Sequence, residues 1–364
     1  MGSFSRDTES DAASSGRSDG ARGGLRTSLT GVQILGTGYC TPGRVVTNEE
    51  LARHGYDSAW IEKRTGIVSR HVADADQATS DLATVAARQC IEGAGLTPSE
   101  VGLIIVATMT TDHATPTSAN IVQANLGCSC PALDVNVACS GFVYSLVTAA
   151  QFLFNGSCRN ALVIGAEKMT YMADPQNMKT FPLFGDGAGA VLVGSENGGD
   201  PSSSGSGTLD PPGILAYKLM SLGEQGQKLV VPSGGSRDPI SVESVVEGKQ
   251  YLHMDGKAVF KWAVKLVPEI IDEILSMAGL KRDDVDLILM HQANRRIIDA
   301  VVQNSGVAPE KVYVNVDRFG NTSAASIPIA LHECMINGRI DPGSIVLMIG
   351  FGGGLSWGGC VFRW

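Results

Sequence analysis

The sequence predicts an α/β fold in which two duplicated halves are related by a pseudo-two-fold axis. Short runs of Val, Ile and Leu alternate with longer segments of helical periodicity, a pattern typical of strands packed against helices. The second observation is an internal repeat, because three blocks of the first half recur in the same order in the second. Residues 94–104 (AGLTPSEVGLI) match 278–288 (AGLKRDDVDLI), 155–156 (NG) match 337–338, and 162–165 (LVIG) match 347–350 (LMIG), at offsets of 184, 182 and 185 residues.

The composition indicates a globular protein that can bury a large core, since 43% of its 364 residues are hydrophobic. The balance of 28 basic against 37 acidic residues argues against nucleic acid as a partner. No apolar run approaches the roughly 20 residues of a membrane span. Eight scattered cysteines suit a reducing cytoplasm, where we expect the protein to reside. The close pair Cys128 and Cys130 lacks the usual spacing of zinc ligands, so we predict no metal site.

Two polar segments set the expected boundaries. Residues 1–29 are mostly Ser, Gly, Arg and Asp, which predicts a disordered N-terminal tail, and their acidic residues argue against a transit peptide. Residues 195–212 are rich in Ser, Gly, Pro and Asp and are interpreted as a polar linker or insertion. The two halves are therefore expected at 30–194 and 213–364.

In the first half, Thr47 to Glu50 has the pattern of a capping box that opens a helix. Residues 185–190 (GDGAGA) superficially fit a dinucleotide-binding fingerprint. That fingerprint needs a helix after it, and the strand predicted at 191–194 excludes it. The other strands are expected at 32–35, 103–107, 133–138 and 161–165, and the helices at 81–93, at 117–126 and directly after Cys139.

In the second half, a long helix is expected at 257–278 with a bend at Pro268, because proline removes a backbone donor. A glycine loop is expected at 350–354. The remaining strands are predicted at 214–220, 287–290, 312–316 and 345–349, and the remaining helices at 294–304 and 321–337.

Cys139 is the first candidate functional residue, because an apolar strand ends there and a charge-free helix follows. The helix is apolar nearly all round, so it should be buried. The positive end of a helix lowers the pKa of a thiol, and the thiolate is the reactive form. Cys139 is therefore a candidate covalent nucleophile. The alternative is a structural cysteine, since free cysteines are among the most buried residues.

The repeat adds two partners to Cys139. At the offset of 182 residues, Cys139 corresponds to Asn321, which places both at the heads of equivalent helices that meet near the pseudo-two-fold axis. His291 directly follows the strand 287–290, at the carboxyl end where α/β sheets place their ligands. We therefore expect the three side chains to converge.

Cys, His and Asn together favour acyl transfer followed by decarboxylation. A thiolate exchanges thioesters readily, and His291 and Asn321 can both donate hydrogen bonds. Because an amide is not a base, the carbanion would come from loss of CO₂, with both donors holding the developing oxyanion. A second oxyanion hole is expected from the N–H groups of Cys139 and of the loop 351–354, although that loop alone could equally be a turn.

Six motifs spread from residue 60 onward make the sequence resemble β-ketoacyl-[acyl-carrier-protein] synthase III, a family of the thiolase fold. The resemblance covers the chain from about residue 31 to its end and implies a layered α-β-α-β-α arrangement. The motifs are 60–66 (WIEKRTG), 137–142 (VACSGF), 184–189 (FGDGAG), 291–294 (HQAN), 320–326 (GNTSAAS) and 351–358 (FGGGLSWG).

The resemblance implies a homodimer that starts type II fatty acid synthesis. It implies loading of an acyl group from acyl-CoA onto Cys139 and condensation with malonyl-[acyl-carrier protein], with release of CO₂ and no cofactor. His291 and Asn321 would stabilise the enolate. By the same resemblance, the N–H groups of Cys139 and Gly353 hold the acyl oxygen, Phe184 and Phe351 line the acyl pocket, and Trp60, Arg64 and Thr65 contact CoA.

Two positions depart from the family pattern. Met178, followed by Lys179, stands where other members have an Arg that stacks on the adenine. Thr115 stands where many members have a Phe that closes the acyl pocket across the dimer, and its smaller side chain predicts a longer or branched primer.

Lys257, Lys261 and Lys265 are spaced to share one helix face, and with Arg296 they are candidates for docking an acidic carrier protein. Such a stripe is also typical of a solvated surface. A starter synthase of a polyketide or related pathway remains an alternative, as does a catalytically silent binding homologue, although the latter should have lost Cys, His or Asn. A non-decarboxylating thiolase is disfavoured by Asn321.

Overall fold

The computed structural model describes residues 27–195 and 211–364. Most of the predicted tail and linker therefore lies outside the described residues. The tail was predicted to extend to residue 29, but Leu29 already belongs to a strand and is 1% exposed, because its side chain packs among buried apolar residues. No helix in the two described ranges is both long and apolar enough to cross a membrane.

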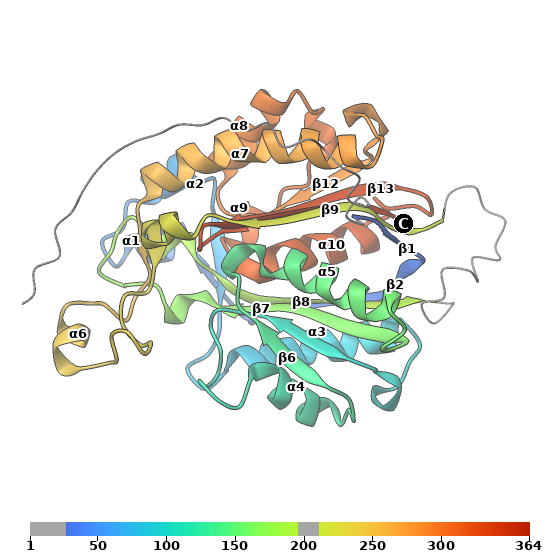
Figure 1. Ribbon diagram of the computed structural model, residues 1–364. Coiled ribbons are helices and arrows are strands. Elements are labelled where there is room, and N and C mark those ends of the chain that lie inside the picture. Colours follow the sequence, from blue (N-terminus) through green and yellow to red (C-terminus); the bar gives the residue numbers. More distant parts are fainter. Residues whose placement is uncertain (1–26, 196–210) are drawn as a thin grey trace, which may run out of the picture.

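The structure has five layers, as the sequence predicted (Figure 1). Two five-stranded sheets enclose a central layer formed by α5 (Gly141–Phe154) and α10 (Ser326–Ile336). The helices α7 (Gly256–Met277) and α8 (Arg295–Ser305) cover the outer face of one sheet, and α3 (Thr79–Gly93) and α4 (Ser118–Leu126) cover the other. The central helices are buried on nearly all sides, which is why their sequences carry so little charge.

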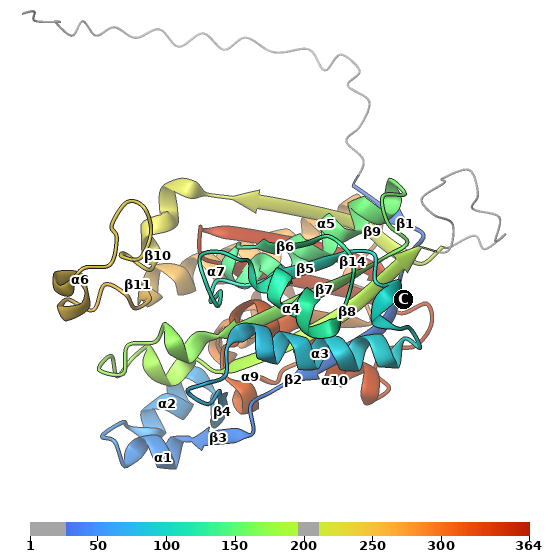
Figure 2. The same ribbon diagram turned by 90° about the horizontal axis from the view of Figure 1, so that it is seen from below.

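The first half builds one sheet, which Figure 2 shows with α3 and α4 lying across it. Its strand order is β2-β8-β7-β5-β6, with β5 parallel to both β6 and β7 and the other pairs antiparallel. The predicted nucleotide fingerprint is part of β8, which confirms its rejection. The strands are β2 (Val32–Cys40), β5 (Ile104–Ala107), β6 (Ala132–Val135), β7 (Asn160–Lys168) and β8 (Asp186–Ser195).

The second half builds the other sheet in the order β1-β9-β14-β13-β12, with β12 and β13 parallel. The short β1 comes from the N-terminal end of the described chain and pairs with β9. The strands are β1 (Leu29–Thr30), β9 (Gly213–Ser221), β12 (Leu287–Met290), β13 (Ile345–Gly352) and β14 (Ser356–Arg363).

Smaller elements extend the structure at the end where the two halves present their loops. Thr47 caps the first of them by accepting a hydrogen bond from the Glu50 N–H, as predicted. The α6 segment projects away from the layers (Figure 1). These elements are the hairpin of β3 (Arg44–Thr47) and β4 (Ser69–Val72), the hairpin of β10 (Leu229–Val230) and β11 (His253–Met254), and the helices α1 (Asn48–Ala52), α2 (Ser58–Thr65) and α6 (Val242–Val246).

The duplication is visible in the two central helices, but its offset corrects the predicted pairing of Cys139 with Asn321. The 3-10 turn 138–140 precedes α5, and the 3-10 turn 323–325 precedes α10, both at an offset of 185 residues. Cys139 therefore corresponds to Ala324. The offset of 182 holds only at the far ends of these helices, because α10 has 11 residues and α5 has 14.

Reciprocal glycine contacts support this alignment of the halves. A Cβ on Gly165 would lie 2.2 Å from the Ala324 carbonyl oxygen, and a Cβ on Gly350 would lie 3.2 Å from the Cys139 carbonyl oxygen. Both glycines and both carbonyls are related by the same 185-residue offset. Each turn thus packs against the sheet of the opposite half.

Two further predictions were wrong near the second of these turns. The strand predicted at 312–316 is reduced to a single bridge between Ile288 and Val312, because Val316 already begins the short helix α9 (Val316–Phe319). The helix predicted from residue 321 begins at Ser326. The residues before it form an irregular turn that exposes the Asn321 side chain to the interior, so the amide does not lie at a helix start.

Candidate active site

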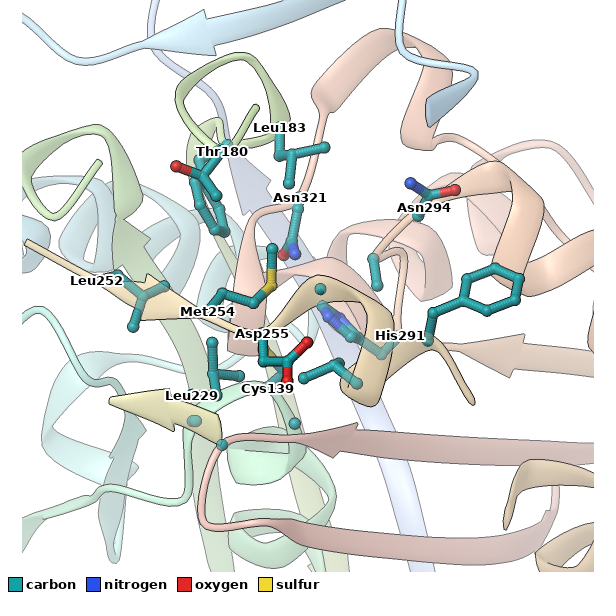
Figure 3. A pocket seen from close by; sticks show the side chains of 18 of the residues that line it. Cys139, Thr180, Leu183, Leu229, Leu252, Met254, Asp255, His291, Asn294 and Asn321 are labelled. Carbon is teal, nitrogen blue, oxygen red and sulfur yellow. The ribbon is translucent and has the colours of Figure 1, made fainter. Parts of the chain in front are cut away.

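A cavity of about 1150 Å³ lies where the loops of the two halves meet. Its lining includes Cys139, His291 and Asn321, which come from three segments far apart in the sequence. In Figure 3 the side chains of His291 and Asn321 extend toward the same central space, and Cys139 lies beside it. The predicted convergence of the three side chains is therefore present in the structure.

Cys139 lies in the 3-10 turn between β6 and α5, one residue after a strained position. Ala138 has a φ of 45°, which is unusual for a residue other than glycine and is typical of functional sites. We expected the start of α5 to lower the pKa of the thiol. Instead, burial raises the pKa of Cys139 to about 12, against smaller lowering by hydrogen bonds from Ser323 and from its own backbone N–H. The resting side chain is therefore a neutral thiol.

His291 follows the last residue of β12, as predicted, and is 2% exposed. Its backbone N–H donates to the Ile349 carbonyl at 2.8 Å, and its ring packs edge-on against Phe351. The Nδ1 atom lies 2.8 Å from the Ser326 hydroxyl. Burial lowers the pKa of His291 to about 3, so the imidazole is neutral at physiological pH.

Asn321 is held by both halves of the molecule. Its N–H donates to the Leu183 carbonyl at 2.8 Å, and its carbonyl accepts from the Gly185 N–H at 3.2 Å. The side-chain oxygen accepts from the Ser323 N–H at 2.9 Å, so this bond assigns the amide orientation. The Nδ2 group is therefore the part of the amide that can donate to a ligand.

The glycine loop approaches Cys139 more closely than any side chain would allow. A Cβ on Gly352 would lie 2.8 Å from the Cys139 Cβ and 3.0 Å from its Sγ. A Cβ on Gly353 would lie 3.2 Å from the Ala138 Cβ. The backbone of this loop is thus packed directly on the nucleophile turn, where N–H groups can reach an acyl oxygen on the sulfur.

Sequence reasoning missed two buried polar residues beside Cys139. Glu167 lies in the middle of the apolar strand β7, and Ser323 lies in the turn before α10; both are 0% exposed. The Ser323 hydroxyl donates to Glu167 at 3.0 Å and also hydrogen-bonds the Cys139 thiol. A lone carboxylate within the run 160–166 (NALVIGA) was the signal that could have drawn attention to Glu167.

The predicted CoA residues Trp60, Arg64 and Thr65 all line the cavity. Thr65 is buried, and its hydroxyl donates to the Ile61 carbonyl at 2.6 Å, so it also serves its own helix. Met178 is 42% exposed and is not among the lining residues, whereas the adjacent Lys179 is. A cation is thus available beside the position where the family pattern has an Arg.

The other predicted site residues divide into two groups. Phe184 and Phe351 line the cavity, as do the exposed Lys257, Lys261 and Arg296, whose guanidinium lies 5.6 Å from the Phe260 ring centre. Thr115 and Lys265 are exposed and do not line it. Within residues 27–195 and 211–364, no group of three or more His, Cys, Asp or Glu residues could hold a metal ion.

Comparison with known proteins assigns the family. The model described as 3-oxoacyl-[acyl-carrier-protein (ACP)] synthase III matches residues 133–208, and its C-terminal counterpart matches residues 275–364. A β-ketoacyl-[acyl-carrier-protein] synthase III of Rhodopirellula baltica is 49% identical over 345 residues, covering 92% of this chain and 99% of that protein. The chain belongs to the β-ketoacyl-[acyl-carrier-protein] synthase III family.

Solved structures agree with this assignment. The synthase III of Aquifex aeolicus superposes with a TM-score of 0.80 at 38% identity, covering 92% of this chain and all of that one. The priming β-ketosynthase of the R1128 polyketide pathway superposes with a TM-score of 0.81 at 34% identity, covering 94% and 98%. The predicted family and thiolase fold are thereby confirmed, and the chain is a condensing acyltransferase.

Proposed function

We propose that this enzyme loads an acyl group from acyl-CoA onto Cys139 and condenses it with malonyl-[acyl-carrier protein], which starts type II fatty acid synthesis. The observation that carries the proposal is a thiol that shares one cavity with a neutral imidazole and an amide N–H donor. The strong likeness to the synthase III of Rhodopirellula baltica supports it.

In the loading step, the sulfur of Cys139 attacks the thioester carbonyl and CoA leaves as a thiolate. The tetrahedral oxyanion would lie between the N–H groups of Cys139 and Gly353. Because the site is buried, each such donor is worth more than in water, about 10²- to 10³-fold in rate. The close packing of the glycine loop on the nucleophile turn holds these donors in place.

In the condensation step, loss of CO₂ from the malonyl group leaves an enolate whose oxygen accepts from His291 Nε2 and Asn321 Nδ2. A neutral histidine donates through one nitrogen only. The Ser326 hydroxyl lies 2.8 Å from both His291 Nδ1 and the Ser323 carbonyl, so its single proton can serve either one. When Ser326 donates to Nδ1, the ring proton resides on Nε2, where the enolate needs it.

The chemistry of these groups favours decarboxylation over proton abstraction. With a pKa near 3, His291 is a weak base, and the Asn321 amide has no basicity. Neither group can remove a proton from carbon, but both can hold a developing oxyanion. The substrate carboxylate supplies the electron pair instead.

Incubation with radiolabelled acyl-CoAs of graded chain length tests the proposal. Label should be retained on the wild-type protein and absent from Cys139→Ser. With Thr115 at the pocket-closing position, we expect loading of chains longer than acetyl, and a sharp preference for acetyl-CoA would contradict that part. Failure of every acyl-CoA to label the wild type would reject the priming role.

A role in priming a polyketide pathway is the second candidate, favoured by the likeness to the R1128 priming synthase and by the departures at Met178 and Thr115. Turnover of the acyl-enzyme with malonyl-CoA against malonyl-carrier protein distinguishes the extenders. We also propose a homodimer, in which the exposed Thr115 would reach the partner's acyl pocket. Sedimentation of the purified protein tests the dimer.

A further inference from the structure

Glu167 is a buried carboxyl group to which the mechanism above gives no role. It receives four hydrogen bonds, from the hydroxyls of Thr108, Thr110 and Ser323 and from the Met109 N–H. Burial raises its pKa to about 7, although all of these hydrogen bonds act in the opposite direction. In the described part of the chain it takes part in no printed ion pair, so this charge is stabilised by dipoles alone.

The other titratable groups around Glu167 are turned away or engaged elsewhere. Lys168 pairs with Asp186 at the neighbouring position of β7 and β8, on the opposite face of the sheet. The Lys168 amino group donates to the carbonyls of Asp74 and Gln77. The titratable group that faces Glu167 is the Cys139 thiol.

Ser323 joins the carboxyl to the thiol. Its hydroxyl donates to Glu167 Oε1 at 3.0 Å, so the oxygen of that hydroxyl is free to accept from the Cys139 S–H. Ser323 has a φ of 49°, in the left-handed region that side chains other than glycine rarely adopt. Such strain persists where the surroundings hold a residue in a required position. Here it places one hydroxyl between two buried titratable groups.

Loading needs a base for the thiol, because the resting Cys139 is neutral. The His291 ring is the other candidate, but its Nδ1 is engaged with Ser326, and its proposed role requires a proton on Nε2. The chain of Cys139, Ser323 and Glu167 supplies a separate path on the opposite side of the sulfur from the enolate donors.

We infer that Glu167 accepts the Cys139 proton through the Ser323 hydroxyl, an inference that rests on the acyl-transfer role proposed above. In loading, the thiol proton moves to Ser323 Oγ while the Ser323 proton moves to Glu167 Oε1. The sulfur then forms its bond to the acyl carbon, the bond to CoA breaks, and the CoA thiolate takes a proton from solvent.

The proton stays on Glu167 while the acyl group occupies Cys139. In condensation, the enolate carbon attacks the acyl carbon and its bond to Sγ breaks, which releases a thiolate. That thiolate takes the proton back from Glu167 along the same path. Each turnover thus consumes one solvent proton, and both buried groups return to their starting states.

Alkylation of Cys139 by iodoacetamide tests the relay without any acyl-CoA. Its rate would be followed by mass spectrometry from about pH 5.5 to about 9.5, beside single-turnover acyl loading. Glu167→Gln removes the base, and Ser323→Ala interrupts the path but keeps the carboxyl. Asp186→Asn is the matched control, since it removes another fully buried carboxylate that is bonded to Thr170 and Ala73.

In the wild type, both rates should rise with pH and level off above about 7, once Glu167 is ionised. In Glu167→Gln and Ser323→Ala, the rates at pH 8 should fall about 10²-fold. They should also keep rising with pH, because hydroxide is then the remaining base. Asp186→Asn should retain the plateau of the wild type.

A wild-type profile in Glu167→Gln overturns the relay, as does a profile lost in Ser323→Ala alone. If Glu167→Gln does not fold, the Ser323→Ala profile decides. Failure of acyl loading with a normal alkylation plateau rejects the proposed function and leaves the relay standing. Normal loading with unchanged alkylation in both variants does the reverse.

Discussion

Replacing Gly352 by Ala should separate the nucleophile turn from the glycine loop. The added methyl carbon would lie 2.8 Å from the Cys139 Cβ, whereas carbon atoms in contact prefer about 3.5 to 4.0 Å. The backbone must therefore yield by about 1 Å on one side. The other close atoms are the Cys139 Sγ at 3.0 Å and N at 3.2 Å, so no flexible side chain can absorb the shift.

The expected effects follow from that displacement. Overpacking of this kind costs about 1 to 3 kcal/mol of stability. A displacement of about 1 Å between reacting groups costs about 10²-fold in rate. Single-turnover loading with radiolabelled acyl-CoA measures the rate, and denaturant unfolding measures the stability. Gly43→Ala is the control, because a methyl group there meets no atom within 4 Å. If Gly352→Ala loads as fast as the wild type, the loop does not position the nucleophile as described.

Four other outcomes are expected. Asn321→Asp puts a negative charge beside the developing enolate, so malonyl decarboxylation should fall at least 10²-fold while acyl loading survives. Ser326→Ala removes the hydroxyl at His291 Nδ1 and should lower condensation but not loading; equal losses in both steps would contradict this. Reversing Lys261 and Arg296 to Glu should raise the KM for malonyl-carrier protein and spare loading, and an unchanged KM would remove the docking proposal. Because the pKa of Glu167 is raised from 4.5 to about 7, the folded state binds the extra proton, and stability is lost as pH rises through this range. Unfolding at pH 5 and pH 8 should therefore show Glu167→Gln gaining about 3 kcal/mol on the wild type between the two, and a constant difference would refute it.

Hydrophobic periodicity was enough to predict most of the framework. The strand β12 has the predicted bounds, and His291 follows it directly, because an apolar run ended by a polar residue marks a buried strand end. The position of Cys139 was accessible for the same reason. The roles of the site residues came from chemistry and resemblance, and they stay proposals here.

The errors arose where local geometry decides the outcome. Pairing Cys139 with Asn321 used an offset valid only beyond the shortened end of α10. The irregular turn before α10 depends on tertiary hydrogen bonds such as that between Asn321 and Leu183, which no local pattern encodes. The pKa of Cys139 depends on how deeply the completed fold buries the sulfur, and burial here outweighs the favourable helix end.

The paired contacts of Gly165 and Gly350 show how one repeated unit came to carry two chemistries. In two identical copies, the turns before α5 and α10 would have been chemically equal, each resting on its neighbour's sheet. Joined in a single chain, they were free to diverge. The first turn kept a thiol, and the second has Ala324 at the matching position and contributes the Asn321 amide and the Ser323 hydroxyl instead. The asymmetry that catalysis requires was thus reached by changing side chains on a backbone that stayed symmetric.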